Sequence, residues 1–180
     1  MEKFVLKIKD ENIDLEDYLK SLPFVSSFKH TKGDIFSFDI EEDFHDEALD
    51  IFELMESDFY SIIKGFYYTS LFDETQINFL VSILDNKPGG IYRVGELLDY
   101  AIKNNINAKD IFKPFIRKSL SDELYNTAYV YIINGSSTIA SELLYIHRNT
   151  LNYRLDVIKK ITSLDLRLFV DKVVFYILTS

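Results

Sequence analysis

The 180-residue chain contains no cysteine, which excludes disulfide bonds and thiolate chemistry. This absence is compatible with a reducing compartment, and we expect a cytoplasmic protein. Met1 is followed by a charged segment, so we expect no signal peptide. No apolar run reaches the roughly 18 residues of a membrane-spanning helix, and we expect no membrane contact.

Signatures of catalysis are also missing. The three histidines, His30, His45 and His147, have no HExxH or Cys/His spacing that would bind zinc. There is no nucleophile elbow and no dinucleotide fingerprint, and no Lys-Ser/Thr pair follows Gly89-Gly90 to make a phosphate-binding loop. The acidic segment 41–47 could bind a cation, but a charged helix start explains it better. We therefore expect neither an enzyme nor a bound cofactor.

The net charge of −9 is unevenly distributed along the chain. Residues 1–120 hold 14 Lys and Arg against 23 Asp and Glu, a net charge of −9, whereas residues 121–180 hold six of each. The acidic character thus belongs to the N-terminal part. A neutral C-terminal module would make few phosphate contacts, so useful occupancy of DNA would require two copies on adjacent half-sites.

The first 70 residues predict a small α/β domain. Strands are expected over 3–9, 24–31, 35–40 and 60–70, with a turn at Lys32-Gly33-Asp34. Helices are expected over 15–22, where Pro23 ends the pattern, and from Asp43 to residue 55 or 56. Strand, helix, hairpin, helix and strand in this order are typical of a split βαβ unit with an antiparallel sheet.

Residues 73–120 predict a helical connector. Helical spacing of apolar residues covers 73–84, 94–104 and 110–120, the last with a kink or interruption near Pro114. Asn86-Lys-Pro-Gly-Gly90 is the clearest break in the chain.

Residues 137–160 predict two helices joined by a tight turn. The first helix carries Ile139, Ala140, Leu143 and Leu144, and Ile146 is placed to fill the angle between the helices. The second carries Leu151, Leu155 and Ile158 as one apolar stripe. This is the pattern of a helix-turn-helix, in which the first helix braces the second and crosses the DNA backbone.

Polar residues of the second helix lie away from that stripe. At about 100° per residue, the positions opposite Leu151 are Asn149, Asn152, Tyr153, Asp156 and Lys160, with Arg148, Thr150 and Arg154 on the flanks. Asn can pair with adenine and Arg with guanine, while Thr and Tyr can bind phosphate. Asp156 fits a DNA-facing surface poorly and could instead orient an arginine. Arg154 lies near the apolar stripe and could reach an acid instead of a phosphate.

The segment Ile146-His-Arg-Asn-Thr-Leu-Asn-Tyr-Arg-Leu155 resembles the signature that closes PucR/CdaR-type bacterial transcription regulators. Leu124–Asn134 resembles that family's leading helix, Ile139-Ala-Ser-Glu-Leu143 its AA-x-x-L helix, and Leu164-Asp-Leu166 its G-x-D-L ending. The resemblance covers about the last third of the chain. It implies double-stranded DNA as partner and control of transcription, with the contacts made by His147, Arg148, Asn149, Thr150, Asn152, Tyr153 and Arg154. His147 would position the helix start or reach a phosphate, and we favour a turn or cap role over a metal ligand.

A second, weaker resemblance concerns the N-terminal part. Its element order is similar to degenerate GGDEF-like domains, and Gly33, Asp34 and Phe36 match their hairpin motif. Ile35 replaces the acid that would hold a metal, which favours a simple Gly-Asp turn over nucleotide cyclisation.

The predicted architecture is therefore α+β: a small antiparallel βαββαβ-like domain, a helical middle, and an all-α helix-turn-helix bundle. The expected divisions are a sensing or dimerisation domain over 1–72, a connector over 73–120 and a DNA-binding domain over 121–180. The helix 166–178 is apolar almost all round and is expected to be buried, either in the core of the DNA-binding domain or also against a second subunit, and a homodimer is favoured. An unknown small-molecule effector is a further possible partner. Two alternatives stay open: a protein-interaction adapter that has lost DNA binding, and a nucleotide-handling or nucleotide-sensing N-terminal part.

Overall fold

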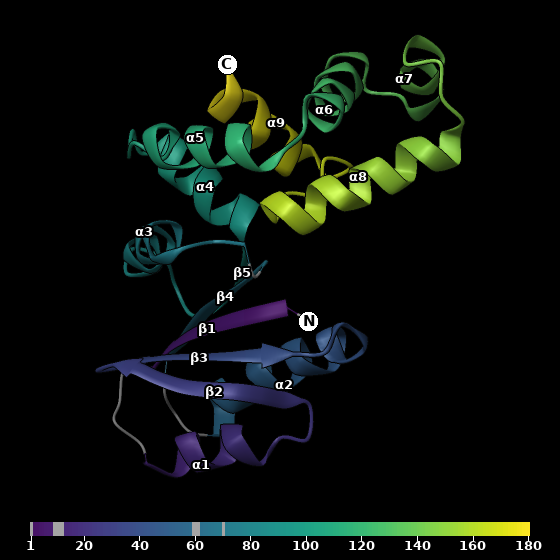
Figure 1. Ribbon diagram of the computed structural model, residues 1–180. Coiled ribbons are helices and arrows are strands. Elements are labelled where there is room, and N and C mark those ends of the chain that lie inside the picture. The colour runs from purple at the N-terminus through teal and green to yellow at the C-terminus, as the bar shows by residue number, and fades with distance from the viewer. Residues whose placement is uncertain (1, 9–12, 59–61, 70) are drawn as a thin grey trace. The chain divides into compact units, whose positions relative to one another are not determined.

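The computed structural model describes residues 2–8, 13–58, 62–69 and 71–180 (Figure 1). The chain folds into two compact units, one of residues 1–70 and 81–93 and the other of residues 71–80 and 94–180. It therefore passes between the units at three places. The three-part division expected from the sequence is a different partition and stays a prediction.

The first unit is built on a five-stranded sheet with strand order β2-β3-β1-β4-β5. The strands β1 (Glu2–Ile8), β2 (Val25–Lys32), β3 (Ile35–Ile40) and β4 (Ile63–Tyr68) pair antiparallel, as the split βαβ pattern predicts. The predicted ends at Lys9, Tyr60 and Ser70 lie outside the described residues.

Helices α1 (Ile13–Ser21) and α2 (His45–Asp58) pack against one face of this sheet, with a short 3-10 turn (Glu42–Phe44) before α2. Residues of β3 alternate between buried and partly exposed, because successive side chains of a strand point to opposite faces. The core beneath the sheet combines aliphatic residues with several phenylalanines, and the rings of Phe4 and Phe38, directly opposite in the β1–β3 register, stack 5.9 Å apart.

Strand β5 (Gly90–Arg93) was not predicted from the sequence. It pairs parallel with β4, and α3 (Glu74–Leu84) lies between the two strands in the chain. A parallel connection of this kind requires a crossover, which the helix supplies. The sheet is thus mixed, with one parallel edge strand beside an antiparallel ladder.

The second unit is helical. It contains α4 (Val94–Lys103), α5 (Lys109–Ser119), α6 (Asp122–Asn134), α7 (Ser137–Leu143), α8 (Arg148–Thr162) and α9 (Phe169–Thr179). Helix α5 runs through Pro114, so of the two predicted alternatives the interruption is wrong and the kink stays a prediction. Helix α8 packs against α6 and α7, whereas α9 packs against α4, α5 and α6 (Figure 1).

Helix α9 is buried on one side within the single chain, and its expected contact with a second subunit stays a prediction. Val174, Phe175 and Leu178 are buried, but Phe169 is 79% exposed and Tyr176 is 46% exposed. The apolar residues of this helix extend around more of its circumference than α4, α5 and α6 cover. Within the described residues, no helix is both long enough and apolar enough to cross a membrane.

Candidate nucleic-acid interface

Helices α7 and α8 are joined by a tight turn whose geometry fixes the start of α8. Helix α7 begins after Ser136, whose hydroxyl accepts a hydrogen bond from the Ile139 backbone N–H. Tyr145, in the turn, has a left-handed backbone (φ 53°) and is 95% exposed. The next N–H, that of Ile146, donates back to the Ser141 carbonyl at 3.0 Å. Two helices joined so tightly form a helix-turn-helix.

His147 is the cap of α8. Its backbone is extended, and its Nδ1 accepts a hydrogen bond from the Asn149 N–H at 3.2 Å. Such a side chain satisfies one of the backbone donors left free in the first helical turn. The predicted cap role of His147 is confirmed by this geometry.

The apolar stripe of α8 is fully buried, and its polar residues are at the surface. Leu151, Leu155 and Ile158 are each 0% exposed. The exposed polar residues comprise most of the predicted contact set and three further positions: His147, Arg148, Asn149, Thr150, Asn152, Tyr153, Asp156, Lys159 and Lys160. One helix face therefore holds α8 in the bundle, and the other presents amide, hydroxyl and guanidinium groups.

Arg154 differs from the rest of the predicted set. Its side chain is 16% exposed, and it donates hydrogen bonds to the Glu123 carboxylate and, at 3.2 Å, to Thr127 Oγ1. Both partners lie on α6. The alternative that Arg154 reaches an acid matches this arrangement, in which its guanidinium ties α8 to α6.

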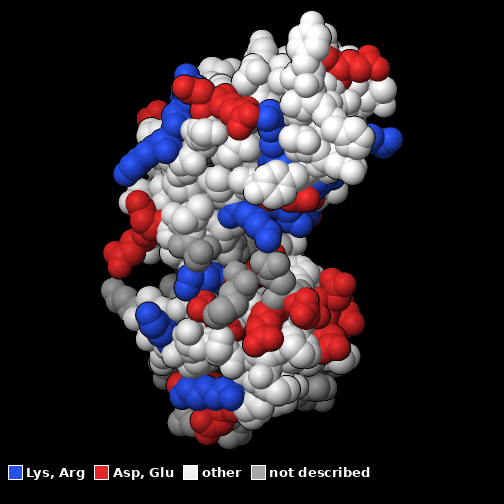
Figure 2. Space-filling model, turned by 45° about the vertical axis from the view of Figure 1, so that its right-hand side comes forward, with Lys and Arg blue, Asp and Glu red and all other residues white. Residues whose placement is uncertain are grey.

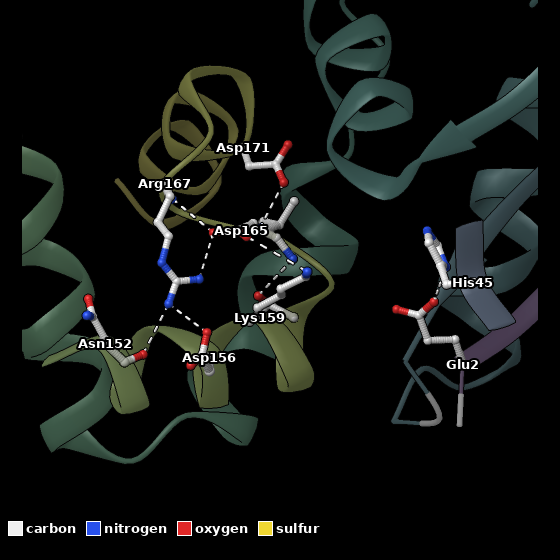
Figure 3. A network of polar contacts seen from close by, with 10 residues as sticks. Glu2, His45, Asn152, Asp156, Lys159, Asp165, Arg167 and Asp171 are labelled. Atoms are coloured by element: carbon white, nitrogen blue, oxygen red, sulfur yellow. Dashed lines mark hydrogen bonds and ion pairs between the residues drawn. The ribbon is translucent and has the colours of Figure 1, made fainter. Parts of the chain in front are cut away.

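Asp156 is paired with an arginine that sequence reasoning missed. Arg167, in the loop between α8 and α9, lies over α8, and its Nη2 donates to Asp156 Oδ1 at 2.6 Å and to the Asn152 carbonyl at 3.1 Å (Figure 3). Burial lowers the pKa of Arg167, but its hydrogen bonds and the charges of Asp165 and Asp156 outweigh this effect and raise it. The acid on the outward face of α8 is thus matched by a positive charge. No sequence signal marked Arg167, because it lies outside the helix it contacts.

Apolar side chains are exposed on the two helices preceding α8. Tyr129 and Ile133 of α6 and Ile139 and Leu143 of α7 are each about half exposed. On the face shown in Figure 2, basic and acidic side chains of the helical unit lie in separate small groups instead of one basic field. This distribution agrees with the zero net charge of residues 121–180.

Neither a metal centre nor a nucleotide site stands out among the described residues of the first unit. No group of three or more candidate metal ligands occurs among them, and the Glu42 side chain of the acidic segment 41–47 lies outside them. His45 Nδ1 is instead 2.5 Å from Glu2 Oε2 (Figure 3). In the β2–β3 hairpin, Gly33 has a left-handed backbone (φ 57°), as a tight turn requires.

Comparison with known proteins identifies the domain to which these helices belong. Residues 124–178 match the PucR C-terminal helix-turn-helix domain, a segment that spans most of α6 to α9. The chain is 33% identical over 106 residues to the proline-responsive transcriptional activator PutR of Bacillus subtilis, covering 53% of this chain and 26% of PutR. It is 34% identical over 85 residues to the carbohydrate diacid regulator of Escherichia coli, covering 45% of this chain and 22% of that protein.

The chain thus spans about a quarter of the length of these curated relatives. Among solved structures, a regulator of polyketide synthase expression from Bifidobacterium adolescentis aligns with a TM-score of 0.46 and 14% identity, over 98% of this chain and 78% of that one. The domain match over 124–178 and the two relatives both indicate similarity to transcription regulators. The chain thus carries a C-terminal helix-turn-helix domain of the PucR type and is similar to two transcription regulators.

Proposed function

We propose that this protein is a transcription regulator that binds double-stranded DNA with α8 in the major groove. The observation that carries the proposal is the division of α8 into a buried apolar stripe and an exposed polar face. In helix-turn-helix proteins the N-terminal residues of the second helix meet base edges. The exposed residues at that end of α8 are Arg148, Asn149, Thr150, Asn152 and Tyr153.

The proposed contacts divide by chemistry. Arg148 and Asn152 have side chains that bind base edges through two hydrogen bonds, whereas Thr150 and Tyr153 suit phosphate oxygens. His147 and Arg154 act chiefly by fixing α8, His147 as its cap and Arg154 through α6. A contact of His147 with a phosphate is compatible with its exposure.

A homodimer belongs to the proposal, because residues 121–180 carry no net charge. Phosphate contacts supply most of the non-specific affinity of DNA-binding proteins, so a neutral module on its own binds weakly. Two copies on adjacent half-sites gain affinity through the linkage between them. A small-molecule effector acting through the first unit completes the proposal.

The test is selection of duplexes from a randomised library with the full chain, followed by anisotropy titrations. Arg148→Ala and Asn152→Ala are each expected to weaken binding to the selected duplex by about 1–3 kcal/mol, the cost of losing a base contact. Lys103→Ala, which removes a charge from an exposed pair on α4, is the matched control for Arg148. Asn126→Ala, on the exposed surface of α6, is the control for Asn152.

Two results would reject the proposal. One is enrichment of no duplex by the wild-type chain, which would favour a protein-interaction adapter. The other is unchanged affinity in both α8 variants. A thermal shift on adding GTP with magnesium, or cyclic nucleotides, would indicate a nucleotide sensor in the first unit.

A further inference from the structure

Arg167 lies beyond the C-terminal end of α8 in sequence, yet its guanidinium returns to the middle of that helix (Figure 3). Its Nη2 bridges the Asn152 backbone carbonyl at 3.1 Å and Asp156 Oδ1 at 2.6 Å. These two residues are four positions apart, so they are neighbours on one face of the helix. Arg167 therefore spans one turn of α8 on the side that carries Asn152.

The conformation of Arg167 is itself restrained. Asp165 Oδ1 accepts hydrogen bonds from the Arg167 backbone N–H at 3.1 Å and from its Nη1 at 3.3 Å. The Asp165 N–H in turn donates at 2.8 Å to Asp171 Oδ2, on the first turn of α9, and Asp171 is 1% exposed. The chain of contacts runs from a buried carboxylate to the exposed face of α8. A guanidinium held at both ends loses less conformational entropy per hydrogen bond than a free surface side chain.

Asp156 has a side chain that is 57% exposed on the proposed DNA face. An unpaired carboxylate there would repel the phosphate backbone, and Arg167 supplies the opposite charge at hydrogen-bond distance. The guanidinium contacts only the backbone carbonyl of Asn152 and the Asp156 side chain, so the polar side chains from Arg148 to Tyr153 stay exposed. That part of α8 is the one that meets bases in helix-turn-helix proteins.

We propose that Arg167 is a positioning residue for DNA reading: it holds the Asn152 turn of α8, neutralises Asp156 and sets the C-terminal limit of the DNA-contacting face. This inference rests on the proposed function. A side chain that acts through Asn152 affects discrimination between sequences, whereas a phosphate contact affects all sequences alike.

The experiment uses the full chain and the duplex selected by the wild-type protein, with a shuffled duplex and single-base-pair variants for comparison. Arg167→Ala is expected to weaken binding to the selected duplex by about tenfold and to the shuffled duplex by less than about threefold, the pattern of a lost base-reading geometry. Discrimination between single-base-pair variants should fall at the positions read by Asn152. The salt dependence should keep its slope.

Two further variants separate positioning from charge. Asp156→Asn in the Arg167→Ala background should recover the small loss that both duplexes share, because the uncompensated carboxylate is gone, but it should leave the discrimination lost. Arg167→Lys should likewise discriminate less than the wild-type chain, because a single ammonium does not reproduce the planar fork that bridges two acceptors. If circular dichroism shows that Arg167→Ala does not fold, Arg167→Gln replaces it, and the same measurements are made with and without Asp156→Asn.

Three outcomes would overturn the inference. The first is wild-type discrimination in Arg167→Ala. The second is an equal loss on selected and shuffled duplexes with a salt slope reduced by about one, which would make Arg167 a phosphate contact. The third is a lower melting temperature with unchanged binding by the folded fraction. Failure of the wild-type chain to prefer any duplex would instead reject the proposed function, and this inference with it.

Discussion

Gly95 of α4 lies directly against the carboxylate of Asp171 of α9: a β-carbon at position 95 would stand 2.0 Å from Asp171 Oδ1. The contact brings a buried acid to the first turn of α4, where backbone N–H groups lack helical partners and the helix dipole favours negative charge. The other oxygen of the same carboxylate accepts the Asp165 N–H. A glycine and an aspartate thus join α4, α9 and the loop after α8.

Gly95→Ala should destabilise the protein by about 1–3 kcal/mol, the usual cost of inserting a methyl group into a packed site. In an ordinary helix position the same change stabilises by up to about 1 kcal/mol, so the sign of the effect is diagnostic. Urea denaturation measures it. In an Asp171→Ala background the penalty of Gly95→Ala should shrink, and an unchanged penalty would show that the carboxylate is not the obstacle.

Arg154→Ala should lower the free energy of unfolding by about 1–2 kcal/mol, because the side chain packs its stem between α6 and α8 and donates to a buried hydroxyl. Glu123→Ala should cost less, since the Glu123 side chain is 65% exposed and exposed ion pairs contribute little. Thermal or urea denaturation of both variants gives the comparison. Equal costs would mean that the ion pair, and not the packing and the Thr127 bond, dominates.

His147→Ala should destabilise by about 0.5–2 kcal/mol through loss of the α8 cap, and His147→Asn should restore most of it. Ser121→Ala, which removes the equivalent side-chain cap of α6, is the matched control. Hydrogen exchange at the first turn of α8 should accelerate in His147→Ala alone. Unaltered exchange there would mean that the ring nitrogen contributes nothing to that helix end.

Because the phenol of Tyr68 is buried, we expect the free energy of unfolding to fall at alkaline pH. Burial, assisted by the charge of Asp39, raises the pKa of this phenol from 10.0 to about 12. The folded state therefore favours the neutral phenol, and the resulting stability is complete below pH 10 and is lost as the pH rises from 10 toward 12. The loss should approach about 2–3 kcal/mol over those two pH units.

The measurement compares the wild-type chain with Tyr68→Phe by urea denaturation between pH 8 and the highest pH at which both still fold. Phe cannot ionise, so the stability difference between the two chains should shift in favour of Tyr68→Phe above pH 10. Other tyrosines and lysines titrate equally in both chains and cancel. A difference that stays constant with pH would contradict the raised pKa.

Periodic burial explains which parts of the fold could be predicted. Strand β3 alternates because only one of its faces meets α1 and α2, and α8 shows its stripe because Leu151, Leu155 and Ile158 face one partner surface. Strand β5 has no such pattern, since its four residues are all partly exposed and its pairing partner lies more than twenty residues earlier. Its existence depends on a tertiary contact that no local window contains.

The candidate site could be predicted only where helical periodicity determines which side chains are exposed. The exposed face of α8 follows from helical geometry, and so does the inward position of Arg154 near the stripe. The partner of Asp156 could not be predicted, because Arg167 reaches it across the loop after α8. Which side of α9 the chain itself covers could not be predicted either, because an apolar sequence does not reveal how many neighbours a helix has.

The three passages of the chain between the units have a practical consequence for dissecting the protein. Phe72 and Phe79, from the stretch before β5, pack their rings against Phe112 of α5 in the helical unit. A fragment begun at Val94 would lose those aromatic partners, and one ended at Ser70 would lose β5 from its sheet. No single backbone cleavage therefore yields both units complete. Reconstitution from two complementary fragments would have to restore α3, whose residues are divided between the two units.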